Sequence, residues 1–138
     1  MKRYEQFPHT ADIGVRAYGK SLKELFENAA FAMFDILADL EGITDDLTEK
    51  FKLEAANPEE LLIAWLDELL YRFYTRQIIL SEFKIEEMTD KSLAATAYGR
   101  SVRANRNRLK TEIKAATYAD LAIKKTVDGY SVEIIFDV

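Results

Sequence analysis

Cysteine is absent from this 138-residue chain, and histidine occurs only once, at position 9. Without cysteine the protein can form neither disulfides nor zinc–thiolate sites. Catalytic sites that need a cysteine or a second histidine are excluded, and no serine stands in the Gly-x-Ser-x-Gly context of a hydrolase nucleophile. Gly-rich phosphate-binding loops and Cys-x-x-Cys pairs are also missing. The chemistry that remains depends on carboxylates, lysine and the one histidine.

Long apolar runs are missing too. No stretch approaches the length of a membrane span, and the first five residues lack the apolar segment of a signal peptide. We therefore expect a cytoplasmic protein. Hydrophobic residues make up 49% and charged residues 31% of the chain, which is a globular composition. The length is that of one domain, so we predict a single domain over residues 1–138.

The net charge of −5 conceals an asymmetry along the chain. Residues 1–90 carry 10 Lys+Arg against 19 Asp+Glu, whereas residues 91–138 carry 9 against 5. The basic excess gathers in one segment without an acid, comprising Arg100, Arg103, Arg106, Arg108 and Lys110. This segment could face a phosphate or an acidic protein surface, although the whole molecule is too acidic for general nucleic-acid binding. A solvated loop turning at Asn105 and Asn107 is an equally good explanation.

Two helices are predicted from their start signals and apolar periodicity. Ser21 and Glu24 form a capping box, and the helix that follows extends to about Leu40. Asn57 caps a second helix, whose broad apolar stripe continues to Phe73. The breadth of that stripe predicts that the second helix is the more deeply buried one.

Alternation of apolar and polar residues predicts strands around these helices. They cover residues 13–17, 50–55, a hairpin within 78–97, 111–116, 121–127 and 130–137. Asp128-Gly129 is a hairpin signal between the last two. The element order predicts an α+β fold in two layers, with a mainly antiparallel sheet and two helices packed on one of its faces.

Two carboxylates stand at the ends of predicted strands, far apart in the sequence. Asp12 follows His9 by three residues, and Asp137 lies one residue from the C-terminus. Asp is depleted in strands and seldom buried without a partner. If the two met, their like charges would both stay ionised only with a cation between them. The alternative is that Asp12 ends a turn and Asp137 belongs to a frayed tail.

Lys114 is the remaining candidate for chemistry. Its neighbours Ile113 and Ala115 are apolar, so strand alternation predicts that they face the core and that Lys114 faces the polar side. An ordinary surface lysine paired with Glu112 or Glu133 is the simpler explanation.

Several segments together resemble the archease family, in order and over nearly the whole chain. They are His9-Thr10-Ala11-Asp12, the Ser21–Glu24 helix start leading to Ala30-Phe31-Ala32-Met33-Phe34, Leu66-Asp67-Glu68-Leu69-Leu70-Tyr71, Glu112-Ile113-Lys114-Ala115-Ala116-Thr117-Tyr118, and Phe136-Asp137-Val138. The resemblance implies a non-catalytic accessory protein of the tRNA-splicing RNA ligase, which joins 3′-phosphate and 5′-hydroxyl ends using GTP. Family members are thought to promote guanylylation of the ligase and its multiple turnover.

The resemblance also maps site residues onto this chain. A divalent-metal site falls on Asp12, Asp137 and the terminal Val138, and a functional lysine falls on Lys114. Hard oxygen ligands suit Ca²⁺, with Mg²⁺ and Mn²⁺ as alternatives. Lys114 and His9 are predicted to contact the nucleotide, GTP or RNA, at the ligase active site.

The chain departs from the family pattern at two places, and two other functions stay open. Many relatives place a histidine where this chain has Ala119, and Gly-Glu where it has Gly99-Arg100. We expect the more basic segment to alter partner contact. The protein could instead be a stand-alone metal-dependent phosphohydrolase in which Lys114 stabilises phosphoryl charge. It could also be a structural adaptor whose C-terminus is fastened by the metal.

Overall fold

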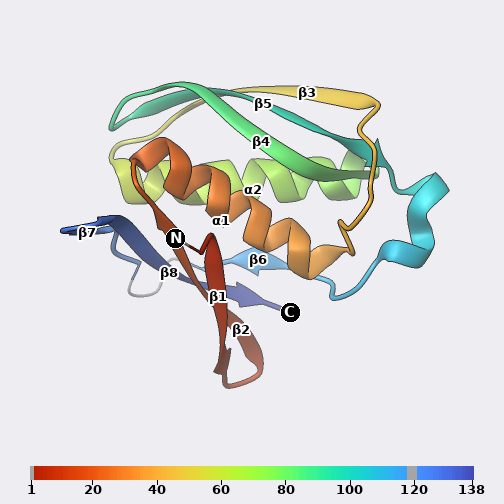
Figure 1. Ribbon diagram of the computed structural model, residues 1–138, viewed down its shortest axis with the longest axis horizontal. Helices are drawn as coiled ribbons and strands as arrows, with labels where there is room; N and C mark the ends of the chain where they lie inside the picture. The colour runs from red at the N-terminus through yellow and green to blue at the C-terminus, as the bar shows by residue number, and fades with distance from the viewer. Residues whose placement is uncertain (1, 118–120) are drawn as a thin grey trace.

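Two antiparallel sheets enclose two long helices in the computed structural model, which describes residues 2–117 and 121–138 (Figure 1). One sheet has five strands in the order β1-β2-β8-β6, with β7 also paired to β8, and the other has the order β3-β5-β4. The elements are β1 (Tyr4–His9), β2 (Asp12–Gly19), α1 (Leu22–Leu37), β3 (Leu47–Glu54), α2 (Pro58–Arg76), β4 (Ile78–Met88), β5 (Ser92–Ser101), the 3₁₀ helix η1 (Arg103–Arg108), β6 (Ala115–Ala116), β7 (Lys124–Thr126) and β8 (Gly129–Asp137).

The first predicted helix is α1, and it begins as its sequence indicates. The hydroxyl oxygen of Ser21 accepts the backbone N–H of Glu24 at 3.2 Å. The helix ends at Leu37, three residues before the predicted end, because Ala38 turns to extended backbone and forms a β-bridge with Leu109. A tertiary pairing therefore sets the C-terminal end of α1.

The second predicted helix is α2. The Asn57 side chain accepts the N–H of Glu60 at 2.9 Å, as the capping signal predicts. The helix ends at Arg76, where Gln77 adopts left-handed backbone with a φ of 54°. Neither α2 nor any other helix in the described ranges has the length and hydrophobicity needed to cross a membrane.

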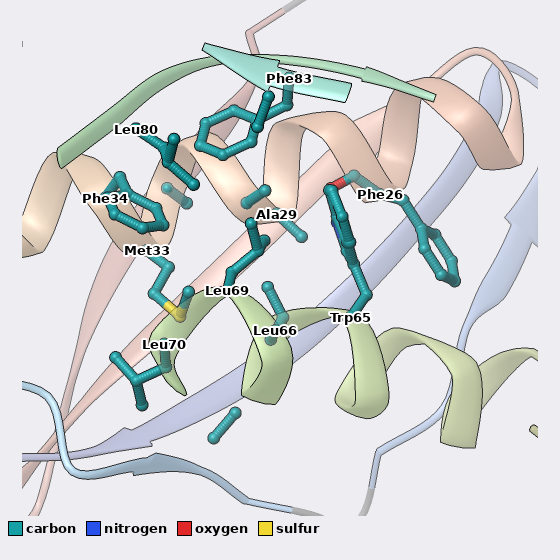
Figure 2. Close-up of a cluster of buried hydrophobic side chains, with 14 of the residues drawn as sticks. Phe26, Ala29, Met33, Phe34, Trp65, Leu66, Leu69, Leu70, Leu80 and Phe83 are labelled. Atoms are coloured by element: carbon teal, nitrogen blue, oxygen red, sulfur yellow. The ribbon is translucent and has the colours of Figure 1, made fainter. Parts of the chain in front are cut away.

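The core lies between the two sheets, around the facing sides of α1 and α2 (Figure 2). Trp65 is fully buried there, and its indole N–H donates to the Phe26 carbonyl at 3.0 Å. The Trp65 ring meets Phe51 of β3 edge-on, with centroids 5.1 Å apart. One cluster of buried residues draws members from both helices and both sheets.

The α+β class, the antiparallel pairing and the two helices are confirmed, but the expectation of one sheet covered on one face is wrong. The strands divide into two sheets, and the helices form the layer between them (Figure 1). Ten of the 16 residues of α1 are buried, which is more than one sheet can cover. Alternation of period two is the same for strands of either sheet, so the local pattern does not reveal how many sheets form.

The predicted strands near the C-terminus are shorter than expected. Of the predicted strand 111–116, only β6 forms. The N–H groups of Lys110 and Thr111 donate to carbonyl groups at the C-terminal end of α1, so they cannot pair with a neighbouring strand. The 121–127 strand reduces to β7, which pairs with β8 through the predicted hairpin. In that hairpin Thr126 pairs with Gly129, whose φ of 139° suits glycine.

Candidate functional site

The predicted site residues form one line across four strands at an end of the five-stranded sheet. His9 of β1 pairs with Asp12 of β2, and Asp12 pairs with Asp137 of β8. Asp137 in turn pairs with Ala115 of β6, the neighbour of Lys114. We call His9, Asp12 and Asp137 the aspartate row. Sheet pairing thus unites residues from both ends of the chain.

The aspartate row lies on the outer face of the sheet, away from the helices. On β8, Val132, Ile134 and Phe136 are buried against the core, as their alternation predicts. Asp137 lies on the opposite face of β8 and is exposed. Asp12 is its direct partner, so both carboxylates project from the same face.

The backbone brings the two carboxylates into the closer of the two antiparallel pair types. The Asp137 carbonyl accepts the Lys114 N–H at 2.7 Å, so it points toward β6 and away from β2. Asp12 and Asp137 are therefore a non-hydrogen-bonded pair, for which Cα atoms lie about 4.5 Å apart. Like charges placed directly opposite one another destabilise a sheet unless a cation neutralises them.

Lys114 directly precedes β6, where the pairing with β8 is irregular. Its N–H binds the Asp137 carbonyl, while Ala115 is the residue paired with Asp137, so two residues oppose one, as in a β-bulge. Ile113 and Ala116 are buried, Lys114 is exposed and Ala115 is half-buried. The exposure of Lys114 is confirmed, but the reasoning that Ala115 faces the core with Ile113 is wrong.

Val138 ends the chain beside this row. Its side chain is half-buried and packs against the core, which restricts where the terminal carboxylate lies. The terminus is therefore held next to Asp137. A third oxygen donor from Val138 is consistent with this packing.

The turn between β1 and β2 holds His9 beside Asp12. The distance from His9 Nδ1 to Asp12 Oδ2 is 3.6 Å, which is longer than a hydrogen bond. The turn places Ala11 at a φ of 60°, a left-handed conformation that costs about 1–2 kcal/mol outside glycine. The local sequence does not signal this strain. Glycine is the residue that usually adopts such a φ, and this chain has alanine there.

A second row of charges crosses the same face four residues further along β2. Arg16 lies between Glu5 of β1 and Glu133 of β8, and we call these three residues the arginine row. Its Nη1 donates to Glu5 Oε1 at 2.6 Å and its Nε to Glu133 Oε2 at 2.9 Å. Hydrogen bonds from Lys2, Tyr18 and Arg16 lower the pKa of Glu5 to about 2. The sequence analysis missed this row, although alternation alone places Arg16 and Glu133 on outer faces.

An apolar row separates the two charged rows. The Phe7 ring covers Gly14, where an added Cβ would lie 2.3 Å from Phe7 Cε2. Gly14 pairs with Ile135 of β8, which is half-buried. Glycine is needed here because the ring packs directly on the backbone.

The donor set at the aspartate row fits a hard divalent cation. Two carboxylates and a terminal carboxylate are the oxygen ligands that Ca²⁺, Mg²⁺ and Mn²⁺ prefer. Within residues 2–117 and 121–138, no three His, Cys, Asp or Glu side chains are grouped to hold a metal ion.

Residues 103–108 of the basic segment form the 3₁₀ helix η1 rather than a hairpin loop, whereas Arg100 belongs to β5 and Lys110 follows η1. Arg108 donates to the carbonyls of Asp39 and Glu41 at 3.2 and 2.6 Å. Lys110 donates to the Asp35 carbonyl at 2.7 Å. Arg100, at the family departure, forms an ion pair with Asp46. The other departure, Ala119, and the motif residue Tyr118 lie outside the described residues.

The fold and the aspartate row define a small α+β protein whose candidate site is a carboxylate pair on an open sheet face. Comparison with known proteins gives its family. Residues 4–138 match the Archease protein family (MTH1598/TM1083). The chain belongs to the archease family.

Individual relatives cover almost the whole chain. Protein archease of Methanosarcina barkeri is 41% identical, covering 99% of this chain and 97% of the relative. Protein archease of Pyrococcus abyssi is 38% identical, covering 94% and 93%. The solution structure of Methanobacterium thermoautotrophicum protein 1598 is 32% identical, with full coverage of both chains and a TM-score of 0.83.

Proposed function

We propose that this protein is a non-catalytic activator of the GTP-dependent RNA ligase of tRNA splicing, and that it promotes guanylylation and repeated turnover of that ligase. Family membership supports the proposal. The observation that carries it is the aspartate row, in which the half-buried Asp12 and the exposed Asp137 oppose one another directly and, among the described residues, neither pairs with a lysine or arginine.

In this proposal Asp12, Asp137 and the Val138 terminus hold a divalent cation, with Ca²⁺ as the first candidate. The cation supplies positive charge against the phosphates of a nucleotide. Three protein oxygens leave coordination positions for water or for a group of the partner. The exposed face allows the row to meet the ligase active site directly.

His9 and Lys114 flank the carboxylate pair on opposite sides along the row. We propose that both contact the nucleotide during guanylylation. The Lys114 ammonium is positioned to neutralise charge on the triphosphate or on the leaving pyrophosphate. The His9 ring is exposed and has polar nitrogens available to a phosphate or a base.

A ligation assay with more RNA substrate than ligase tests the activator role. With ligase, GTP and RNA bearing 3′-phosphate and 5′-hydroxyl ends, added protein is expected to raise the product above one equivalent per ligase. Unchanged product yield would contradict the proposal. Hydrolysis of generic phosphoesters by the protein alone would favour the phosphohydrolase. Metal-dependent protection of the C-terminus from carboxypeptidase, without ligase activation, would favour the adaptor.

The role of Lys114 is tested separately at limiting GTP. Lys114→Ala is expected to lower the activated ligation rate while melting as the wild type does, because the side chain is exposed. Lys124→Ala, an exposed lysine elsewhere on the same sheet, is the control and should activate fully. A Lys114→Ala protein with wild-type activation would remove this residue from the site.

A further inference from the structure

Two of the four exposed large hydrophobic side chains in the described part of the chain, Tyr74 and Leu109, line one cavity, and Tyr71 precedes Tyr74 by three residues on α2. Tyr71 is 63% exposed, Tyr74 is 40% exposed and Leu109 is 41% exposed. The fourth, Val127, belongs to the β7–β8 turn. The cavity is lined by residues near the C-terminal ends of α1 and α2, and these helix ends lie on the side of the molecule where η1 is found (Figure 1).

A cavity of about 360 Å³ opens within this group. Its apolar walls come from Leu37 of α1, Phe73 and Tyr74 of α2, and Leu109, and its polar lining comes from Lys110, Thr111 and Glu112. The Tyr74 ring is fixed, because its hydroxyl donates to the Ile113 carbonyl at 2.6 Å and its edge packs on Phe73. The cavity is therefore preorganised to receive an apolar side chain.

Charged residues belong to the cavity lining and to the helix before it. Lys110 and Glu112 line the cavity, and η1 ends at Arg108, directly before the lining residue Leu109. Arg108 and Lys110 bind backbone carbonyls of α1 and of the residues after it, which anchors the segment. Arg103 and Arg106 are exposed, and within the described residues their guanidinium groups make no hydrogen bond or ion pair. Two exposed cations thus lie on a segment that Arg108 and Lys110 anchor to α1 and the residues after it.

We propose that Tyr71, Tyr74, Leu109, Arg103 and Arg106 form a docking surface for an acidic segment of the ligase that carries one apolar anchor residue. The inference rests on the proposed function and names how the partner is held. The anchor enters the cavity, and neighbouring carboxylates pair with the two arginines. The surface adjoins the candidate site, because Tyr74 binds the carbonyl of the residue before Lys114.

A protein segment fits this surface better than RNA. The chain carries a net charge of −5, which opposes a polyanion. The cavity has apolar walls from α1, α2 and Leu109, and such a concave apolar site suits the side chain of a protein anchor residue. Three of the five cations of the basic segment are already engaged internally by Asp39, Asp35 and Asp46, which leaves two for a partner.

Ligase titrations separate docking from the chemistry of the aspartate row. The double variant Arg103→Glu/Arg106→Glu is expected to raise the concentration for half-maximal activation at least tenfold, with the maximal rate unchanged. Leu109→Asp should raise that concentration in the same way. Asp137→Asn should instead lower the maximal rate. Lys52→Glu/Lys84→Glu reverses two exposed charges on the other sheet and should match the wild type.

The outcomes are distinct. A double variant with wild-type half-activation would overturn the docking surface and leave the proposed function standing. Wild-type protein that fails to activate the ligase contradicts the proposed function, and with it the ligase as partner. If the double variant loses affinity for a fluorescent RNA and keeps its affinity for the ligase, RNA is the occupant and the inference is wrong. Thermal melting checks that each variant is folded.

Discussion

The aspartate row and the arginine row lie on the same face of the same sheet, four residues apart along β2. They differ in whether a cationic side chain balances their carboxylates. In the arginine row, Arg16 stands between two glutamates and is hydrogen-bonded to both. In the aspartate row, Asp12 and Asp137 oppose one another directly. The arginine row thus pairs its carboxylates with a guanidinium group, whereas the aspartate row sets two carboxylates against one another.

The difference shows that the position of an acidic residue on a sheet face does not by itself determine which contacts its carboxylate makes. The Glu5 carboxylate accepts hydrogen bonds from Lys2, Tyr18 and Arg16, so its charge is balanced within the protein. Asp137 makes no such contact with a cationic side chain among the described residues. The neighbours supplied by sheet pairing decide whether a carboxylate is structural or available to a ligand.

Asp137→Asn should produce the largest change in the aspartate row. We expect affinity for Ca²⁺ or Mn²⁺ to fall at least about 100-fold, because even the outer partners of metal ligands are worth 10–100-fold. In EDTA the variant should melt slightly above the wild type, since one of two opposed charges is gone. Calorimetric titration measures the affinity. Glu133→Gln is the matched control, and an equal loss there would contradict a site at the aspartate row.

A Gly-Ser extension after Val138 should have the next largest effect. If the terminal carboxylate is a ligand, moving it should weaken metal affinity by about tenfold. The melting temperature in EDTA should not change, because the Val138 side chain can still pack on the core. The same extension at the N-terminus is the control. Full metal affinity in the C-terminally extended protein would remove Val138 from the ligand set.

Arg16→Met converts the arginine row into two unneutralised glutamates. We expect a fall of a few degrees in melting temperature, larger at low salt because added salt screens surface charges. No metal affinity should appear, because β2 separates Glu5 from Glu133. Lys20→Met, one residue past the end of the same strand, is the control. A variant as stable as the wild type at low salt would show that the row contributes nothing.

The pH dependence of the arginine row follows from the pKa of Glu5. It is lowered from 4.5 to about 2 in the folded protein, so the unfolded chain takes up the proton first as pH falls. The stabilisation is complete above pH 4.5 and disappears as pH falls toward 2. Glu5→Gln should therefore melt below the wild type at pH 7 and level with it near pH 2. A difference that is constant with pH would refute this assignment.

Ala11→Gly should give the smallest effect, because two terms oppose one another. Glycine relieves the left-handed strain at a φ of 60° but gains freedom in the unfolded chain. We expect the free energy of unfolding to rise by no more than about 1 kcal/mol, measured by urea denaturation. Gln77→Gly, with a φ of 54° at the end of α2, is the matched comparison. Opposite signs at the two positions would show that Ala11 does more than turn the chain.

Local signals predicted the elements better than their assembly. Ser21 and Asn57 cap helices as expected, because a cap is an interaction between residues three apart. The end of α1 was misplaced, because Ala38 pairs with Leu109, which is distant in the sequence. The division of strands into two sheets was missed for the same reason. Period-two alternation records that a strand has a buried face, and not which sheet buries it.

The candidate site was predicted in part. Strand-end carboxylates at Asp12 and Asp137 suggested a meeting, and the family resemblance added Lys114, His9 and Val138. The structure brings these residues together, while their roles stay predictions. The reason given for the exposure of Lys114 was wrong, since a bulge opposite Asp137 interrupts the alternation that the argument assumed.

The sequence by itself determined the family, the helix starts and the residue types available for chemistry, because these depend on identity and short spacing. Only the tertiary structure decided that Asp12 faces Asp137 while Arg16 faces Glu133. Register is set by the pairing of β2 with β8 from opposite ends of the chain, and a slip of one residue would place each side chain on the other face. The charge balance of each row is thus a property of strand pairing, which no local pattern encodes.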